Sequence, residues 1–279
     1  MIEAAPRRLK LRSGEVACEI SGAESARLVI GIPGLSANLR SFDVIFEHLD
    51  GSRHRKVAFD PRGRGRSPDT GPGTYGWPSH AADVIEMADQ LGATSFDVLG
   101  WSMGAWIAMV VAKQAPDRVR NVVLIDAAGL PEESIKTPVY AGLDRLSSVF
   151  PSRDAFMQLA SSLPHYQPWE PWRRLFDYEL VTVEGGVSFR TRRAAPWEDE
   201  QYRLKQDPYA LWGALTMPTL LIRAALPIPP NFGYLVTEED YHRFLREVPL
   251  ARGVEIDANH YTVGMNEEAA AAIAKFLDG

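Results

Sequence analysis

Short apolar runs alternate with amphipathic helical patterns along most of this 279-residue chain. The runs are rich in β-branched and aliphatic residues without polar alternation, which is typical of parallel strands buried on both faces. They are RLVIGIPG, HRKVAFD, FDVLGWS, NVVLID, PTLLIRA and GVEIDANH. Apolar stripes at helical spacing cover 81–88, 241–248 and 270–277. This alternation predicts an α/β fold with a mostly parallel, doubly wound sheet, in which sites lie at the carboxyl ends of strands.

Two segments depart from this alternation. Near the amino terminus, RRLKLRSGEVACEISG alternates around Ser13-Gly14 and predicts an antiparallel β-hairpin. A second segment, rich in Pro and Trp, separates Asp126 from the next strand, and a stretch of this length needs structure of its own in a compact domain. We therefore expect a core domain of residues 1–130 and 209–279 with a mostly helical cap inserted at 131–208. The alternative is an irregular surface excursion.

Composition narrows the possible partners. The formal net charge is -6, from 30 basic and 36 acidic residues, which disfavours nucleic acid or an anionic membrane as a partner. Cys18 is the only cysteine, so the sequence has neither an intrachain disulfide nor a Cys-rich metal site. The first residues, MIEAAPRRLKLRSG, lack the apolar region of a secretory signal, and no stretch approaches the length of a membrane span. We expect a cytoplasmic protein that acts on a small molecule; no feature indicates an oligomeric state.

The pentapeptide Gly100-Trp101-Ser102-Met103-Gly104 fits the pattern G-x-S-x-G between a predicted strand over 96–99 and a predicted helix over 105–113. A strand that turns at once into a helix strains the backbone of its central residue, and bulky side chains two positions to either side would collide. The serine then projects at a helix amino terminus, where the helix dipole favours a developing negative charge. In this context the pattern indicates a nucleophilic serine.

At these residues the chain resembles the α/β-hydrolase superfamily, and the resemblance covers nearly its full length. The stretch GIPGLSANLRSFD is similar to the family's loop after the third strand, whose backbone donates to the oxyanion. Pro33-Gly34 stands where the family usually has His-Gly, but a backbone N–H is what the oxyanion needs. The resemblance implies that the N–H groups of Leu35 and Met103 are the oxyanion donors.

His260 is the candidate base. It lies in VEIDANHYTVG, just past the last predicted strand, on the side where parallel strands deliver catalytic residues. It also completes the chain order serine, acid, histidine that this fold shows. A structural histidine is the alternative. The remaining histidines are interpreted as surface residues: His48, His54, His80, His165 and His242.

Asp126 is the candidate acid. The superfamily most often places its acid after the strand that here is PTLLIRA, but residues 224–236 contain no Asp or Glu. The next carboxylates open a predicted helix behind Thr237, which explains them as first-turn residues of a capped helix: Glu238, Glu239 and Asp240. The chain resembles the α/β-hydrolases that carry the acid at the end of the strand next to the serine's, the branch of (E)-2-(acetamidomethylene)succinate hydrolase-like members. The alternative is that Asp126 caps a turn and one of the three later carboxylates is the acid.

The resemblance and the three side chains predict a serine hydrolase that cleaves an ester, lactone, amide or related carbonyl bond of a small, partly hydrophobic molecule. His260 takes the proton of Ser102, and Asp126 holds the imidazole in the required tautomer. No metal or organic cofactor is implied. A serine nucleophile disfavours the branches that attack with a carboxylate, the haloalkane dehalogenases and epoxide hydrolases. The alternatives are a carbon–carbon bond hydrolase and, from a different class, a ligand receptor or a cofactor-free lyase or cyclase.

Two sets of side chains are candidates to contact the substrate. The first is aromatic, with core packing as the alternative for each member: Trp101, Trp169, Trp172 and Trp197. The second is a set of cap arginines that suit a substrate carboxylate, with a solvated surface as the alternative: Arg145, Arg153, Arg173 and Arg174.

Overall fold

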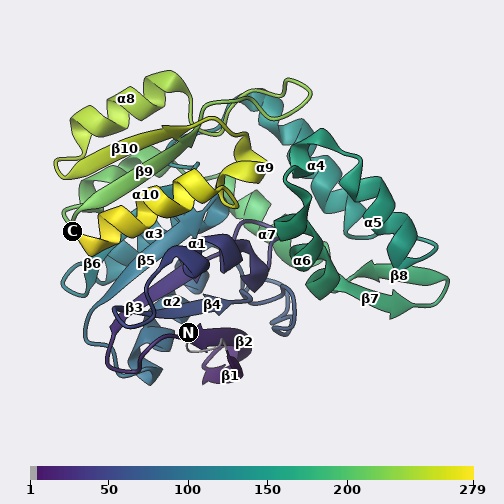
Figure 1. Cartoon of the computed structure of the whole chain (residues 1–279), viewed down its shortest axis with the longest axis horizontal. Helices are drawn as coiled ribbons and strands as arrows, with labels where there is room; N and C mark the ends of the chain where they lie inside the picture. The colour runs from purple at the N-terminus through teal and green to yellow at the C-terminus, as the bar shows by residue number, and fades with distance from the viewer. Residues whose placement is uncertain (1–4) are drawn as a thin grey trace.

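A twisted sheet forms the centre of the computed structural model, which describes residues 5–279 (Figure 1). Within these residues the sheet has eight strands in the order β1-β2-β4-β3-β5-β6-β9-β10. Their bounds are β1 Ala5–Leu11, β2 Gly14–Ser21, β3 Arg27–Ile32, β4 His54–Phe59, β5 Phe96–Trp101, β6 Val119–Ile125, β9 Thr219–Ala224 and β10 Ala251–Ile256. The pairs β1–β2 and β2–β4 are antiparallel and all other pairs are parallel. The predicted hairpin and the mostly parallel sheet are therefore confirmed.

Helices cover both faces of the sheet, and β6 shows why its sequence has no polar alternation. Val122 and Leu124 pack into the cluster formed with helices α2, α3 and α8. Val123 and Ile125 pack into the opposite cluster with α1 and α10, and all four side chains are 0% exposed. The bounds of these helices are α1 Asp43–His48, α2 Trp77–Gln90, α3 Met103–Gln114, α8 Glu238–Glu247 and α10 Glu267–Asp278. A strand buried on both faces needs apolar residues at every position.

The segment between β6 and β9 lies beyond the sheet, on the side where β10 leads into α9 (Figure 1). Its elements are the 3-10 turns η2 Glu133–Ile135, η3 Pro164–Tyr166 and η4 Pro208–Ala214, the helices α4 Lys136–Arg145, α5 Arg153–Ser161, α6 Trp169–Glu179 and α7 Ala194–Arg203, and the strands β7 Leu180–Val183 and β8 Gly186–Phe189. The Phe156 ring packs 4.9–5.3 Å from the rings of Phe150, Phe176 and Phe189. The β7–β8 hairpin was not predicted, because its strands are too short to show alternation.

Two of the histidines interpreted as surface residues are buried. His54 opens β4, and its Nε2 lies 2.9 Å from Asp278 Oδ1. His80 lies in α2, and its Nε2 is 2.9 Å from Asp199 Oδ2. Each is 2% exposed, so the interpretation was wrong for both. The reason is that each imidazole pairs with a carboxylate from a distant part of the chain.

No helix of residues 5–279 has the length and apolar character required to cross a bilayer.

Candidate active site

Ser102 stands between β5 and α3 in a strained turn, with φ 57° and ψ -122°. The flanking glycines are required by close backbone contacts. A Cβ on Gly100 would lie 2.0 Å from the Gly104 carbonyl oxygen, and one on Gly104 would lie 2.0 Å from the Ile32 carbonyl oxygen. Any larger residue would push the helix off the sheet. This turn therefore holds the serine at the carboxyl end of β5.

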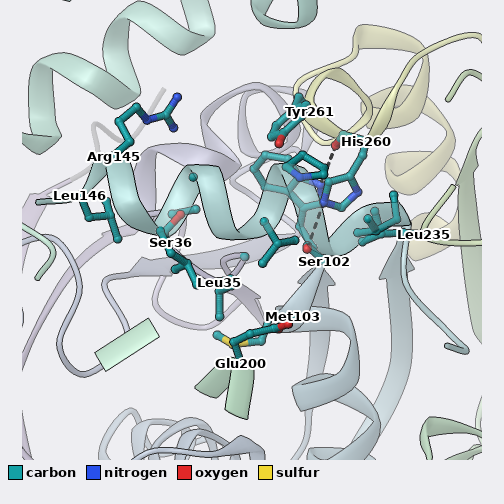
Figure 2. Close-up of a pocket in the computed structure, with 18 of the residues that line it drawn as sticks. Leu35, Ser36, Ser102, Met103, Arg145, Leu146, Glu200, Leu235, His260 and Tyr261 are labelled. Carbon is teal, nitrogen blue, oxygen red and sulfur yellow. Dashed lines mark hydrogen bonds between the residues drawn. The ribbon is translucent and has the colours of Figure 1, made fainter. Parts of the chain in front are cut away.

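The structure brings Ser102, His260 and Asp126 together, and Figure 2 shows the contact between Ser102 and His260. His260 Nε2 lies 3.0 Å from Ser102 Oγ, and His260 Nδ1 lies 2.8 Å from Asp126 Oδ2. The Asp126 side chain is 2% exposed and that of His260 is 11% exposed. A buried carboxylate requires hydrogen-bond donors, and the imidazole supplies one of them.

Asp126 has a positive φ of 49°, and within residues 5–279 Ser102 and Asp126 are the only non-glycine residues with positive φ. Such conformations cost about 1–3 kcal/mol each, and they persist only where the surroundings impose them. At Asp126 the surroundings are hydrogen bonds to β9. Its N–H donates to the Ile222 carbonyl at 2.8 Å, and its Oδ1 accepts the Ala224 N–H at 2.9 Å.

His260 begins the short helix α9, His260–Val263. Asn259 and Thr262 cap this helix through a reciprocal capping box. The Trp101 indole N–H donates to the His260 carbonyl at 3.3 Å, so the residue beside the serine also holds the histidine's backbone. Both contacts restrict where the imidazole can lie.

The alternative acids lie elsewhere. Thr237 Oγ1 accepts the Asp240 N–H at 3.1 Å, and the three acidic residues form the first turn of α8, as predicted. Asp240 Oδ2 accepts the Tyr209 hydroxyl at 2.8 Å. Among residues 5–279, the carboxylate paired with His260 is that of Asp126.

The two candidate oxyanion donors flank the serine. Met103 is the first residue of α3, where N–H groups have no partner inside the helix. Leu35 follows Gly34, and a Cβ on Gly34 would lie 3.3 Å from Ser102 Cβ. The Leu35 carbonyl accepts a hydrogen bond of 3.0 Å from Arg64 Nε, which anchors this loop. Leu35 and Met103 both line the cavity that contains Ser102 (Figure 2).

The cavity has a largely apolar wall built from both the sheet domain and the segment between β6 and β9. Its aliphatic and aromatic lining includes Leu35, Leu143, Leu146, Leu175, Phe176, Ile228 and Leu235. Of the candidate tryptophans, Trp101 and Trp172 line it, and their rings meet edge to face at 6.2 Å. Trp169 and Trp197 do not line it. Trp169 packs beside Phe176 outside the lining, and Trp197 packs beside Tyr140 and under Arg193, so the expectation fails for these two.

The candidate arginines fall into two groups, one that lines the cavity and one that lies at the surface. Arg145 lines the cavity. The other three are in ion pairs at the surface: Arg153 with Asp177 at 2.9 Å, Arg173 with Glu170 at 2.8 Å and Arg174 with Glu47 at 2.8 Å. For those three the solvated-surface interpretation holds.

Three buried carboxylates of the lining were not predicted: Glu179, Asp199 and Glu200. Asp199 accepts from Arg64 at 2.5 Å and Glu200 accepts from Arg203 at 2.7 Å. Glu179 accepts from Asn38 Nδ2 and the Thr191 N–H, and burial raises its pKa. In the sequence these residues look like the solvated acids of amphipathic helices, so no signal distinguishes them. Within residues 5–279, no cluster of His, Cys, Asp or Glu has the arrangement of a metal site.

A serine on a strand-to-helix turn, facing a histidine at the end of a mostly parallel sheet, defines the class of the α/β hydrolases. The chain belongs to this family: the model of the alpha/beta hydrolase fold family matches residues 27–168.

Curated relatives are similar to the chain over part of their length. A serine hydrolase-like protein of Dictyostelium discoideum is 26% identical over 200 residues, covering 66% of this chain and 52% of that protein. N-formylmaleamate deformylase of Pseudomonas putida is 31% identical over 188 residues, covering 67% of this chain and 58% of that protein. The chain thus spans little more than half the length of either relative.

Among solved structures, that of E-2-(acetamidomethylene)succinate hydrolase superposes with a TM-score of 0.88. The match covers 99% of this chain and 100% of that chain, at 22% sequence identity. This likeness establishes the fold over nearly the full length of the chain.

Proposed function

We propose that this protein is a serine hydrolase that cleaves an ester, lactone, amide or related carbonyl bond of a small, partly hydrophobic molecule. The observation that carries the proposal is the chain of contacts from Ser102 Oγ to His260 Nε2, at 3.0 Å, and from His260 Nδ1 to Asp126, at 2.8 Å. These are the distances at which a histidine acts as a general base toward a serine.

In the proposed reaction, Ser102 Oγ forms a bond to the carbonyl carbon while His260 Nε2 takes its proton. Asp126 accepts from Nδ1–H and stabilises the imidazolium. The leaving oxygen or nitrogen departs with the proton of His260. Water then attacks the carbonyl carbon of the acyl-serine while His260 Nε2 takes its proton. His260 returns this proton to Ser102 Oγ as the acyl–oxygen bond breaks, which releases the acid and restores the serine.

The N–H groups of Leu35 and Met103 are the proposed donors to the tetrahedral oxyanion. Both residues border the cavity beside Ser102, and an oxyanion hole needs donors already in place where the charge develops. The anchoring of the Leu35 carbonyl by Arg64 favours such preorganisation.

Residues 131–208 are proposed to act as the cap over this site, on a core of 1–130 and 209–279. The cap's side chains supply much of the apolar lining, Trp172 and Leu143 among them. A cavity with an apolar wall and few polar groups suits a medium-sized, partly hydrophobic acyl or alcohol group. The relatives named as a serine hydrolase-like protein and a deformylase support hydrolysis at a carbonyl group.

A fluorophosphonate probe tests the proposal. We expect stoichiometric labelling of Ser102 in the folded protein, located by peptide mass spectrometry, and none in Ser102→Ala. Exposed Ser134 offers a matched control, since Ser134→Ala should label like the unmodified protein.

Burst kinetics with 4-nitrophenyl esters would show the acyl-enzyme. Failure of folded protein to label at Ser102 would overturn the proposal, and tight ligand binding without turnover would favour the receptor alternative.

A further inference from the structure

Arg145 is the cationic side chain of the cavity that has no anionic partner among residues 5–279. It is the last residue of α4 and lines the cavity with Ser102 and His260 (Figure 2). The one other arginine of the described lining, Arg203, is paired with Glu200 at 2.7 Å, and that lining contains no lysine. Three further arginines of the same segment are paired at the surface.

The guanidinium of Arg145 is held in position, but not all of its N–H donors have an acceptor among the described residues. Its Nη1 donates to the Tyr166 hydroxyl at 2.6 Å, while its buried Nε has no hydrogen-bond partner within the described residues. Its Cζ lies 5.8 Å from the centre of the Tyr166 ring and 5.7 Å from that of Phe189. Aromatic faces offset part of the cost of burying a cation, but they do not supply the planar pair of acceptors that a guanidinium fits.

Three titratable groups in or beside this cavity have pKa shifts that favour their uncharged forms. Tyr261, next to His260, lines the same cavity, and burial raises its pKa to about 12, so its hydroxyl is protonated at neutral pH. Burial, with a smaller contribution from the charge of Arg145, lowers the pKa of His165. The remaining unpaired carboxyl of the lining is Glu179, and its raised pKa favours the uncharged form. An incoming anion therefore meets a cation without an anionic partner among residues 5–279, together with the Tyr261 hydroxyl as a donor.

We propose that Arg145 is a specificity-determining residue that binds a carboxylate of the substrate, with the Tyr261 hydroxyl as a second donor. The substrate class is then a carboxylate-bearing ester, lactone or amide whose scissile carbonyl reaches Ser102 while its carboxylate reaches Arg145. This inference rests on the proposed function for its turnover test, but the anion site itself can be measured without turnover.

The turnover test uses esters in two series, each compared with its own methyl-capped form. One series carries the carboxylate on the acyl side, the mono-4-nitrophenyl esters of glutaric to suberic acid, and the other carries it on the alcohol side, 4-acetoxybenzoate. We expect kcat/KM to favour the free carboxylate by about 10- to 100-fold in at least one series, the range of a charge-assisted hydrogen bond. In Arg145→Met the ratio should fall to about one, and Arg145→Lys should retain part of it, because it keeps the charge without the planar fork.

Arg173→Met is the matched control, because Arg173 lies at the surface of the same segment in ion pairs with Glu170 and Asp177. It should keep the preference of the unmodified protein. A preference that survives in Arg145→Met, or the absence of any preference in both series, would overturn the proposal. Should Arg145→Met not fold, as judged by circular dichroism, Arg145→Gln takes its place in the same comparison.

A binding test separates this proposal from the catalytic one. Isothermal titration calorimetry of Ser102→Ala with adipate should show binding that weakens by at least about tenfold in Ser102→Ala/Arg145→Met. If the fluorophosphonate probe fails but adipate binding depends on Arg145, the anion site stands and the hydrolase proposal falls. If adipate does not bind, or binds equally to both variants, the anion site is wrong.

Discussion

The Asp126 carboxylate joins the ends of two neighbouring strands to the histidine: Oδ1 accepts the Ala224 N–H of β9 at 2.9 Å, and Oδ2 faces His260 Nδ1 at 2.8 Å. Ala224 is the position after which the superfamily most often carries its acid, and here the backbone at that strand end supports a carboxylate from β6 instead. This contact explains why the apolar strand NVVLI ends on a charged residue. Both oxygens of the buried carboxylate have donors.

Asp126→Asn should abolish most of the activity without a large effect on folding. An amide at this position favours the wrong imidazole tautomer, and the equivalent exchange in serine proteases lowers kcat about 10⁴-fold. Steady-state kinetics with a 4-nitrophenyl ester measures the loss. The amide variants Glu238→Gln, Glu239→Gln and Asp240→Asn are the controls, and each should stay within about threefold of the parent, because none acts on His260 in the structure. Activity retained in Asp126→Asn and lost in one of these would assign the acid to α8.

Gly104→Ala should lower both stability and activity. Its Cβ would meet the Ile32 carbonyl oxygen at 2.0 Å, and the strain would shift the loop that carries Leu35. A displacement of about 1 Å at a reacting group costs about 100-fold in rate, and overpacking of this kind costs about 1–3 kcal/mol of stability. Gly213→Ala is the matched control, because nothing lies within 4 Å of a Cβ there. Equal rates and equal unfolding midpoints for the two variants would show that the close approach at Gly104 is unimportant.

The buried pair Arg64–Asp199 should make stability depend on acid pH. Burial alone would raise the pKa of Asp199, but the charges of Arg64 and His80 outweigh it and hold this pKa well below the usual value. A carboxyl whose pKa is lower in the folded state binds more protons when unfolded, so it stabilises the fold above about pH 4 and loses that contribution as pH falls further.

Asp199→Asn leaves the Arg64 charge buried without an anion, which costs about 3–5 kcal/mol of unfolding free energy at pH 7. Urea unfolding between pH 7 and pH 3 should show this loss and a weaker decline of stability with acid than in the parent protein. An identical decline in both proteins would mean that Asp199 contributes nothing to the acid dependence.

Cys18 should be unreactive in the folded protein. It is 2% exposed in β2, and burial raises its pKa to about 11, so little thiolate is present at pH 8. An aromatic disulfide reagent should titrate one thiol per chain in strong denaturant and react far more slowly without it, because Cys18 is the only cysteine. Rapid stoichiometric reaction of the native protein would show that β2 opens readily.

Features with a local physical cause could be predicted from the sequence. The strand-to-helix turn at Ser102 follows from the sterics of the glycines around it, and the capped start of α8 follows from Thr237 and the acids behind it. The two-faced burial of β6 follows from a run without polar residues. In each case the residues that determine the structure are neighbours in the chain, so the pattern can be recognised without knowing the fold.

Contacts between segments that are distant in the chain could be recognised only from the folded structure. Arg145 and Arg173 look alike as helical arginines of one segment, but packing turns one into the cavity and leaves the other in surface ion pairs. His80 is buried because Asp199 meets it from 119 residues away. The Ala224 N–H reaches Asp126 because β6 and β9 pair side by side. A sequence sets the local backbone and the periodicity of its apolar residues, whereas the pairing of a charge depends on which distant element the assembled core places next to it.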